Sequence, residues 1–164
     1  MRQGSYQEFI NLLEEIANRH PDIKFFHELE EKEVVEGKLR KKVKYPAMMV
    51  EYPDLGFADN KGNTDKLSLT GFAILENVPE GNDVRKREVL ARTEGIMLDV
   101  ISYLREERKK ARFHVDTNEF KANKVGPEFS DNLYGWRLEL RHRSWVDLHF
   151  RPAEWNDYDP EKFK

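Results

Sequence analysis

The feature that most constrains the fold is a short apolar strip between two prolines, in a chain in which 36% of the residues are charged. Proline donates no backbone hydrogen bond and is best placed at the first residue of a strand, so Pro46 is expected to begin a strand and Pro53 to end its pairing. The residues between them, 47–52, are apolar and β-prone, which suits a strand covered by helices on at least one face. The strip, residues 45–53, is YPAMMVEYP.

The residues after the strip predict a returning strand. LGFADN leads into Lys61, Gly62 and Asn63, a turn signal, and the chain continues as DKLSLTGFAILENV. Two sets of residues alternate in this segment, as they do along a strand. The sets are Leu67, Leu69, Gly71 and Ala73, and Ser68, Thr70, Phe72 and Ile74. Residues 47–75 therefore predict a long β-hairpin.

An amphipathic helix is expected before the hairpin. Ser5 and Glu8 have the capping-box spacing, in which a hydroxyl and a carboxylate satisfy backbone donors at a helix start. Pro21 then acts as a stop signal, which places the helix at about residues 6–19. The apolar residues that share one face of this helix are Phe9, Leu12, Leu13 and Ile16.

A longer helix is expected after the hairpin, at about residues 84–110. Asn82 or Asp83 can cap its start. The basic residues 105–112 fall near its C-terminus, where positive charge suits the helix dipole, and this structural role is favoured over phosphate binding. The apolar stripe recurs at spacings of three and four: Val89, Thr93, Ile96, Met97, Val100, Ile101 and Leu104.

Shorter strands are expected in the remaining segments. Residues 23–44 join an acidic to a basic stretch with few apolar anchors, which favours a solvated strand or hairpin at a sheet edge. Residues 113–115 and 119–125 indicate short strands. Alternation over residues 134–141 predicts a half-buried strand, which residues 146–150 extend or follow.

Together these elements predict an α+β fold: a single domain with a mostly antiparallel sheet and a long β-hairpin, packed against an N-terminal helix and a long central helix. The domain is expected to span residues 1–150. A polar C-terminal tail, residues 151–164, follows it and is expected to be loosely held.

The composition excludes several classes of protein. The 28 basic and 31 acidic residues nearly cancel, so the chain lacks the basic excess of a dedicated nucleic-acid binder, and no specific nucleic-acid binding is expected. The chain has no cysteine, which excludes disulfides and thiolate metal sites. No apolar run approaches the ~20 residues of a membrane span, and the N-terminus does not begin a signal peptide. We expect a soluble intracellular protein with no membrane association.

The motifs predict neither a metal site nor a cofactor. His27 and Glu28 begin like a zinc-protease motif, but the second histidine is missing, and the five histidines show no ligand spacing. Residues 59–65 contain the ingredients of a calcium loop without its sixth-position glycine or closing glutamate, so a hairpin turn explains them better. The usual signatures of acyl transfer and nucleotide hydrolysis are also missing.

One segment of the sequence resembles the pattern of magnesium-dependent nucleases, since Pro53 and Asp54 are followed by Asp59 and Lys61. In those folds the second cluster lies on a paired strand. Here only a few residues separate the two clusters, and the turn signal at 62–63 places Lys61 in a turn. The nuclease is therefore the least favoured hypothesis for the function of this chain, and no enzymatic activity is expected.

The order of the elements resembles that of the tail terminator proteins of long-tailed phages, the lambda type in particular. The best-matching piece is the strip, whose aromatic-Pro-Ala start leads into a short apolar strand. GWRLELRH, residues 135–142, is similar to the family's last strand, and residues 71–75 to its middle strand. The resemblance covers about residues 5–143. The charged segment 28–44 is longer than the family pattern.

This resemblance implies a structural virion protein that forms a ring, a hexamer, on the end of the tail tube, stops tube polymerisation and offers a surface for head joining. Its partners would be further copies of itself, the tail tube protein and the head-connector protein. It would be located in the virion tail, and in the host cytoplasm during assembly. The alternative is an intracellular binding or adaptor domain of other function. The candidate interface residues are Phe57, Asp59, Asn60, Lys61, Asn63, Asp65, Arg137, Arg141 and Trp145.

Overall fold

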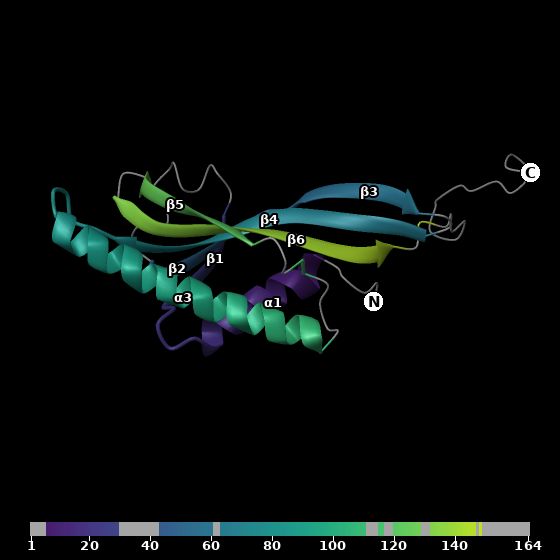
Figure 1. Cartoon of the computed structure of the whole chain (residues 1–164), viewed down its shortest axis with the longest axis horizontal. Coiled ribbons are helices and arrows are strands. Elements are labelled where there is room, and N and C mark those ends of the chain that lie inside the picture. Colours follow the sequence, from purple (N-terminus) through teal and green to yellow (C-terminus); the bar gives the residue numbers. More distant parts are fainter. Residues whose placement is uncertain are drawn as a thin grey trace, which may run out of the picture.

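The chain forms a six-stranded sheet and two helices in the computed structural model (Figure 1), which describes residues 6–29, 43–60, 63–110, 115–116, 120–128, 132–146 and 148. In chain order the elements are α1 (Tyr6–Arg19), β1 (Phe25–Leu29), β2 (Ala47–Glu51), β3 (Asp54–Asn60), β4 (Asn63–Asn77), α3 (Asp83–Lys109), β5 (Lys121–Glu128) and β6 (Leu133–Val146). The prediction of an α+β fold with a mostly antiparallel sheet, an N-terminal helix and a long central helix is confirmed.

Strand β4 is the centre of the sheet. The strand order is β1-β2-β4-β6-β5, and β3 pairs with β4 beyond the end of β2. Strand β1 runs parallel to β2, with Phe25 opposite Ala47. The described part of residues 23–44 thus contains an edge strand, one of the two alternatives that the sequence left open. Residues 30–42 lie outside the described part of the chain.

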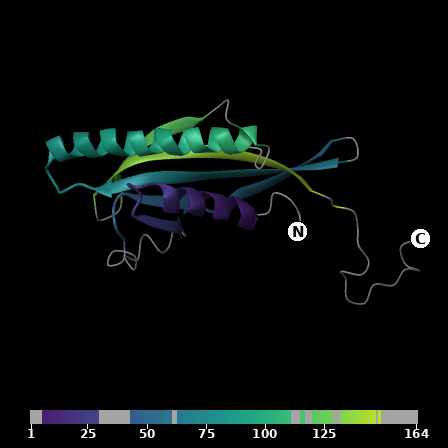
Figure 2. The ribbon, with the colours of Figure 1, turned by 90° about the horizontal axis from the view of Figure 1, so that it is seen from below.

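Both helices pack on the same face of the sheet, which we call the helix-side face (Figure 2). Helix α1 lies toward β1 and α3 toward β6. Phe9 and Leu13 of α1 and Met97 of α3 meet Phe72 and Leu138 of the sheet in the main core. The Trp136 indole also donates to the Leu90 carbonyl of α3 over 2.9 Å, which fixes the helix to the sheet. The opposite face is called the open face.

The apolar strip is buried on both sides of the sheet. Met48 and Val50 belong to the main core beneath the helices. Ala47 and Met49 point the other way and join a second buried cluster on the open face. Because neighbouring residues of a strand point to opposite faces, a strand covered on both sides needs apolar residues at every position. The other buried members of the second cluster are Ala73, Leu75 and Leu133.

The predicted hairpin exists, but its first half is interrupted. Strands β2 and β3 pair in turn with β4, and the break between them falls at Pro53, as expected. The Thr70 hydroxyl donates to the Glu51 carbonyl over 2.6 Å beside this break. Strand pairing continues to the pair Asn60 and Asn63, close to the predicted turn. Turn-forming side chains at 59–60 therefore do not prevent strand pairing here.

Helix α3 begins and ends as its sequence predicts. The Asn82 side chain caps its start by accepting from the Arg85 backbone amide over 2.9 Å. In the described part of the basic run, Lys109 and Lys110 pair with acidic residues one helical turn earlier. The described part of the run thus lies at the C-terminal end of α3, as predicted. No helix in the described ranges is both long and apolar enough to cross a membrane.

The C-terminal strands differ in length from their predictions. Strand β5 continues to Glu128, through an irregularity after Val125, whereas the pattern ended it at residue 125. Of the strand predicted at residues 113–115, the structure describes only Val115, which forms an isolated bridge to His142. Strand β6 ends at Val146, and the predicted tail, residues 151–164, lies outside the described residues.

Candidate interface surface on a projecting arm

Three strands extend beyond the ends of both helices and form what we call the arm (Figures 1 and 2). The arm consists of β3, residues 63–70 of β4 and residues 141–146 of β6. It is held by one continuous ladder, because β4 pairs with β3 on one side and with β6 on the other over these residues. The helix layer therefore covers the body of the sheet and leaves much of the arm without a helix above it.

The register fixes which side chains share the open face of the arm. Residues directly opposite each other in an antiparallel pair point to the same face. Leu67 thus lies between Gly56, which has no side chain, and the cation Arg143. The three rows that cross the open face are Asp54, Leu69 and Arg141; Gly56, Leu67 and Arg143; and Ala58, Asp65 and Trp145.

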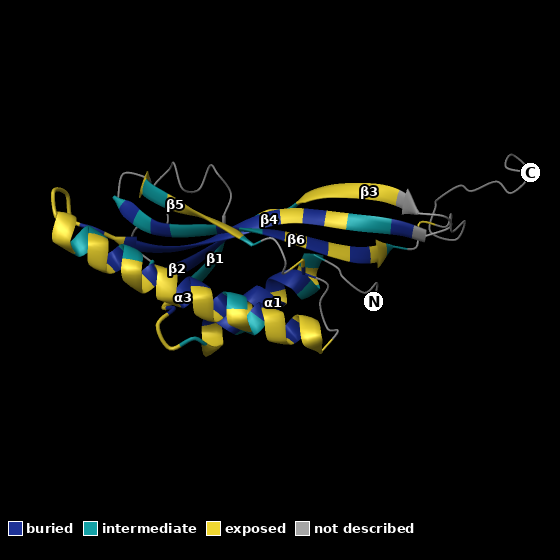
Figure 3. Ribbon diagram, viewed as in Figure 1, coloured by how far each residue is buried: buried dark blue, intermediate teal, exposed yellow. Residues whose placement is uncertain are grey.

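Large apolar side chains are exposed on both faces of the arm. Of the nine large hydrophobic residues that are exposed in the described part of the chain, six lie on the arm or at its base. Strand β3 is exposed along its described length (Figure 3). The six residues and their exposed fractions are Tyr52 50%, Leu55 52%, Phe57 56%, Leu67 37%, Leu69 42% and Trp145 65%.

The small polar residues of the arm show the opposite behaviour. Ser68 and Thr70 of β4 are buried on the helix-side face, as is Ser144 of β6. Within the arm, apolar residues of β4 are thus exposed while its small polar residues are buried. This is the reverse of the usual pattern in a strand with one buried face. Several large apolar residues exposed on one part of a sheet make that part a candidate site of interaction with another molecule.

The structure brings together some of the predicted interface residues. Asp65, Arg141 and Trp145 share the open face of the arm, and Trp145 is the most exposed of the large apolar residues whose positions the structure describes. Phe57 is also exposed, but it lies on the helix-side face beside Lys66. The remaining tip residues are split between strand and turn: Asp59 and Asn60 end β3, Asn63 begins β4, and Lys61 lies outside the described residues.

Sequence reasoning did not identify three of the exposed leucines as interface residues. Leu55, Leu67 and Leu69 were each part of a predicted strand or the loop before it, and nothing in a single alternating pattern says which face is covered. The sequence did contain an indication of this surface. Near the tip of the hairpin, large apolar residues occur at positions that point to each of the two faces of the sheet, and no further apolar segment is available to cover both faces.

Arg137, the other predicted interface residue, lies on the body of the sheet in an ion pair. Its Nε and Nη2 donate to the two carboxylate oxygens of Glu51 over 2.5 and 2.7 Å, and Nη1 lies 3.2 Å from Glu139 Oε1. The hydrogen bond to Glu51 raises the pKa of the Arg137 guanidinium. This pair crosses β4 above Gly71, where an added Cβ would lie 2.9 Å from both Arg137 Nη2 and Glu51 Oε2.

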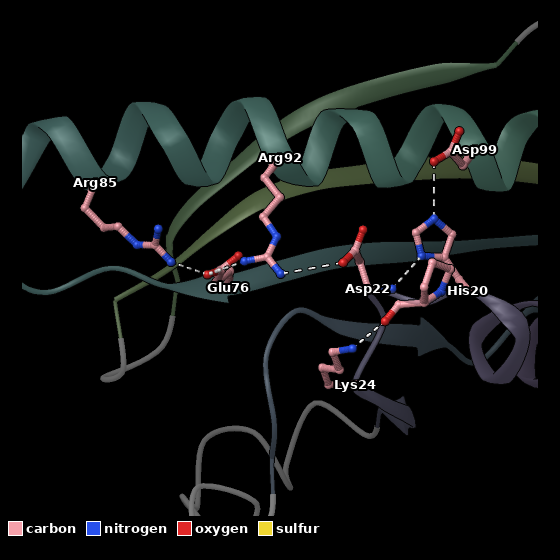
Figure 4. Close-up of polar contacts among 8 residues, drawn as sticks. His20, Asp22, Lys24, Glu76, Arg85, Arg92 and Asp99 are labelled. Atoms are coloured by element: carbon pink, nitrogen blue, oxygen red, sulfur yellow. Dashed lines mark hydrogen bonds and ion pairs between the residues drawn. The ribbon is translucent and has the colours of Figure 1, made fainter.

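A second polar network ties α3 to the opposite end of the sheet (Figure 4). The buried Glu76 carboxylate of β4 accepts from Arg85 over 2.5 Å and from Arg92 over 3.5 Å. Arg92 also lies 4.0 Å from Asp22, which follows α1. The network thus connects the end of α1, the end of β4 and the first half of α3, and its geometry serves to position these elements.

His20 belongs to the same region and is fixed in one tautomer. Its Nδ1 accepts from the Asp22 backbone amide over 3.1 Å, so its Nε2 carries the proton and faces Asp99 over 3.3 Å. Both ring nitrogens are therefore engaged within the fold. This arrangement orients the loop between α1 and β1 against α3.

The nuclease-like residues do not form a catalytic constellation in the described structure. Asp54 and Asp59 lie five positions apart in one strand, β3, rather than on two paired strands. Within the described ranges, no three His, Asp or Glu side chains gather as a metal ion would require.

Comparison with known proteins adds no relative. No protein-family model matches the chain. No curated protein matches it either.

Proposed function

We propose that this chain is a structural subunit of a phage tail, of the tail terminator type, that assembles as a ring on the end of the tail tube. The observation that carries the proposal is the arm, with large apolar residues exposed on both faces. A chain whose work is assembly needs contact surfaces more than catalytic groups. The order of the elements agrees with the resemblance drawn from the sequence.

The arm supplies the kind of surface that such a subunit needs. Removing exposed apolar area from water contributes about 25 cal/mol per Å², so residues such as Phe57 and Trp145 favour docking strongly when a partner covers them. The charged residues beside them, Asp65 and Arg141, can set the register of that contact. Since apolar residues lie on both faces, two neighbours can be engaged at once.

In this proposal the ring is a hexamer that contacts the tail tube protein on one side and the head-connector protein on the other. It stops tube polymerisation by covering the growing end. The subunit acts in the virion tail after assembly in the host cytoplasm. The ring is expected to weaken as ionic strength rises, because exposed ion pairs between subunit edges are screened by salt.

The direct test is to image the purified chain by negative-stain electron microscopy, alone and after incubation with its cognate tail tube protein, and to measure its mass by light scattering. Rings, or closed caps on tube ends, are expected. The matched control is a variant with Phe57→Ser and Trp145→Ser, which removes two exposed arm residues and should fold but not cap tubes. A strict monomer that never associates with the tube protein would contradict the proposal and favour the adaptor alternative.

A further inference from the structure

Two of the open strand edges of the sheet carry opposite charges. Strand β4 is paired with β6 along most of its length, so β3 must lie on the other side of β4, the side of β2. Strand β5 pairs only with β6 and ends the sheet on the opposite side. In the described part of the chain no strand pairs with the outer edge of either β3 or β5. An open edge presents unpaired backbone donors and acceptors to another chain.

The charges of these two edges are complementary. Strand β3 has the sequence DLGFADN, with two acidic residues and no basic one. The first part of β5 has the sequence KANKV, with two lysines and no acidic residue. Residues 121–124 of β5 are all exposed, as is Asp54 at the start of β3. Opposite charges on paired strands are stabilising, whereas like charges directly opposite are destabilising.

These observations argue against a two-fold contact through either edge. Pairing β3 with β3 of another copy would bring acidic residues together, and pairing β5 with β5 would bring Lys121 and Lys124 together. Two other edges are poorer partners for β3. The described outer edge of β1 carries an acidic residue, Glu28, and the distal edge of β6 is bridged by Val115 at His142.

We propose that copies of this chain join head to tail, with the outer edge of β3 in one copy pairing with the outer edge of β5 in the next. This inference rests on the proposed ring and names the strands that close it. A contact between two different surfaces of identical subunits generates a ring when the rotation closes. The ladder is at most five residues long on the β5 side, because the irregularity after Val125 ends regular pairing there.

The test uses the absence of cysteine from the chain, which makes any introduced thiol unique. One variant carries Gly56→Cys on β3, where an added Cβ meets nothing closer than 4.0 Å, and another carries Asn123→Cys on the exposed part of β5, a position that shares the open face with Gly56. The two proteins are mixed and treated with a short bismaleimide. A cross-linked dimer is expected in the mixture and in neither protein alone. The control partner for the β3 variant is Leu98→Cys, a thiol on the exposed side of α3 that should not cross-link.

The outcomes separate this inference from the proposed function. Rings without any cross-link in the mixture would overturn the β3–β5 contact while leaving the ring itself intact. Cross-linking of the Gly56→Cys protein with itself would show a two-fold contact and would also overturn it. The absence of rings and of every other association would count against the proposed function.

A charge exchange gives an independent readout. Asp54→Lys should lower the association constant about fivefold, since it replaces an attraction to a lysine edge by a repulsion. Adding Asp59→Lys, Lys121→Glu and Lys124→Glu to the same chain reverses the charge of both edges and should recover most of that loss. Failure of the exchange to recover association, with all variants folded by circular dichroism, would contradict the pairing.

Discussion

Arg137 of β6 and Glu51 of β2 join two strands that do not touch each other, because their side chains meet above the glycine of the strand between them. The guanidinium donates two hydrogen bonds to the carboxylate, over 2.5 and 2.7 Å. Gly71 of β4 leaves the space in which the pair lies. The open face of the sheet is thus fastened across three strands by residues 86 positions apart in sequence.

Glu51→Gln should lower the free energy of unfolding by about 1 kcal/mol, since it removes the charge from a two-point, partly exposed contact. Urea denaturation measures this. Glu139→Gln is the matched control, because Glu139 makes a single, longer contact of 3.2 Å with the same guanidinium, and its effect should be smaller. Equal effects of the two substitutions would contradict the assignment.

Gly71→Ala should destabilise the fold by about 1 to 2 kcal/mol, because the new Cβ would displace the ion pair. The same substitution should cost less in an Arg137→Ala background, where the guanidinium is no longer in the way. A double-mutant cycle measures this coupling. Additive effects would show that the glycine is required for another reason.

Arg85→Ala should destabilise the fold by about 2 kcal/mol, because it leaves the buried Glu76 carboxylate without its closest cation. Glu76 Oε2 already has no hydrogen-bond partner in the described structure, so the remaining oxygen carries the interaction. Arg92→Ala serves as the comparison and should have a smaller effect, since its contact is 3.5 Å. Thermal melts measure both effects. If Arg92 were the main partner of Glu76, Arg92→Ala would lose more stability than Arg85→Ala.

Phe57→Ser and Leu67→Ser on the arm should each change the free energy of unfolding by less than about 1 kcal/mol, because both side chains are exposed, yet both should weaken association. Met49→Asp is the contrasting variant. Met49 is buried in the open-face cluster, so an unpaired charge there should destabilise the fold by on the order of 3 kcal/mol or more. Circular dichroism melts paired with sedimentation distinguish the two effects. If the arm variants unfold, or assemble normally, the arm is not the interface.

The stability of the protein should fall as the pH rises above 10, in part through Tyr6. Burial, followed by its hydrogen bond to Glu28, raises the pKa of Tyr6 above its ordinary value of 10.0. The folded chain therefore holds this proton more tightly than the unfolded chain. Its stabilising effect is complete below pH 10 and is lost as the pH rises toward the folded-state pKa.

Tyr6→Phe should make this alkaline loss smaller, as urea midpoints between pH 8 and pH 11 would show. Tyr103→Phe is the control, since the Tyr103 hydroxyl accepts from Arg19 on a different part of α1 and has no contact with Glu28. An unchanged pH dependence in Tyr6→Phe would remove Tyr6 as a source of the effect.

No magnesium-dependent cleavage of plasmid DNA is expected from the purified protein. The carboxylates of the nuclease-like pattern, Asp54 and Asp59, belong to a single strand and are not placed across a strand pair. Incubation with plasmid and magnesium, followed by electrophoresis, checks this. Cleavage that disappears in Lys61→Ala would overturn it.

The sequence by itself determined most of the local structure. Capping residues and apolar spacing placed both helices within one or two residues of their ends, because a helix buries one stripe and its ends need specific partners. Proline at 46 and 53 located the strip, and its lack of alternation agrees with a strand that is buried on both faces.

The tertiary structure alone decided which strands are neighbours and which faces are covered. Strand β1 pairs with β2 in parallel. The sequence between the two strands contains no turn signal that predicts this pairing. In β4 the alternation of Leu67 and Leu69 with Ser68 and Thr70 predicts a strand equally well whichever set is buried. The choice depends on which face of the sheet is covered, and a two-residue period contains no information about that.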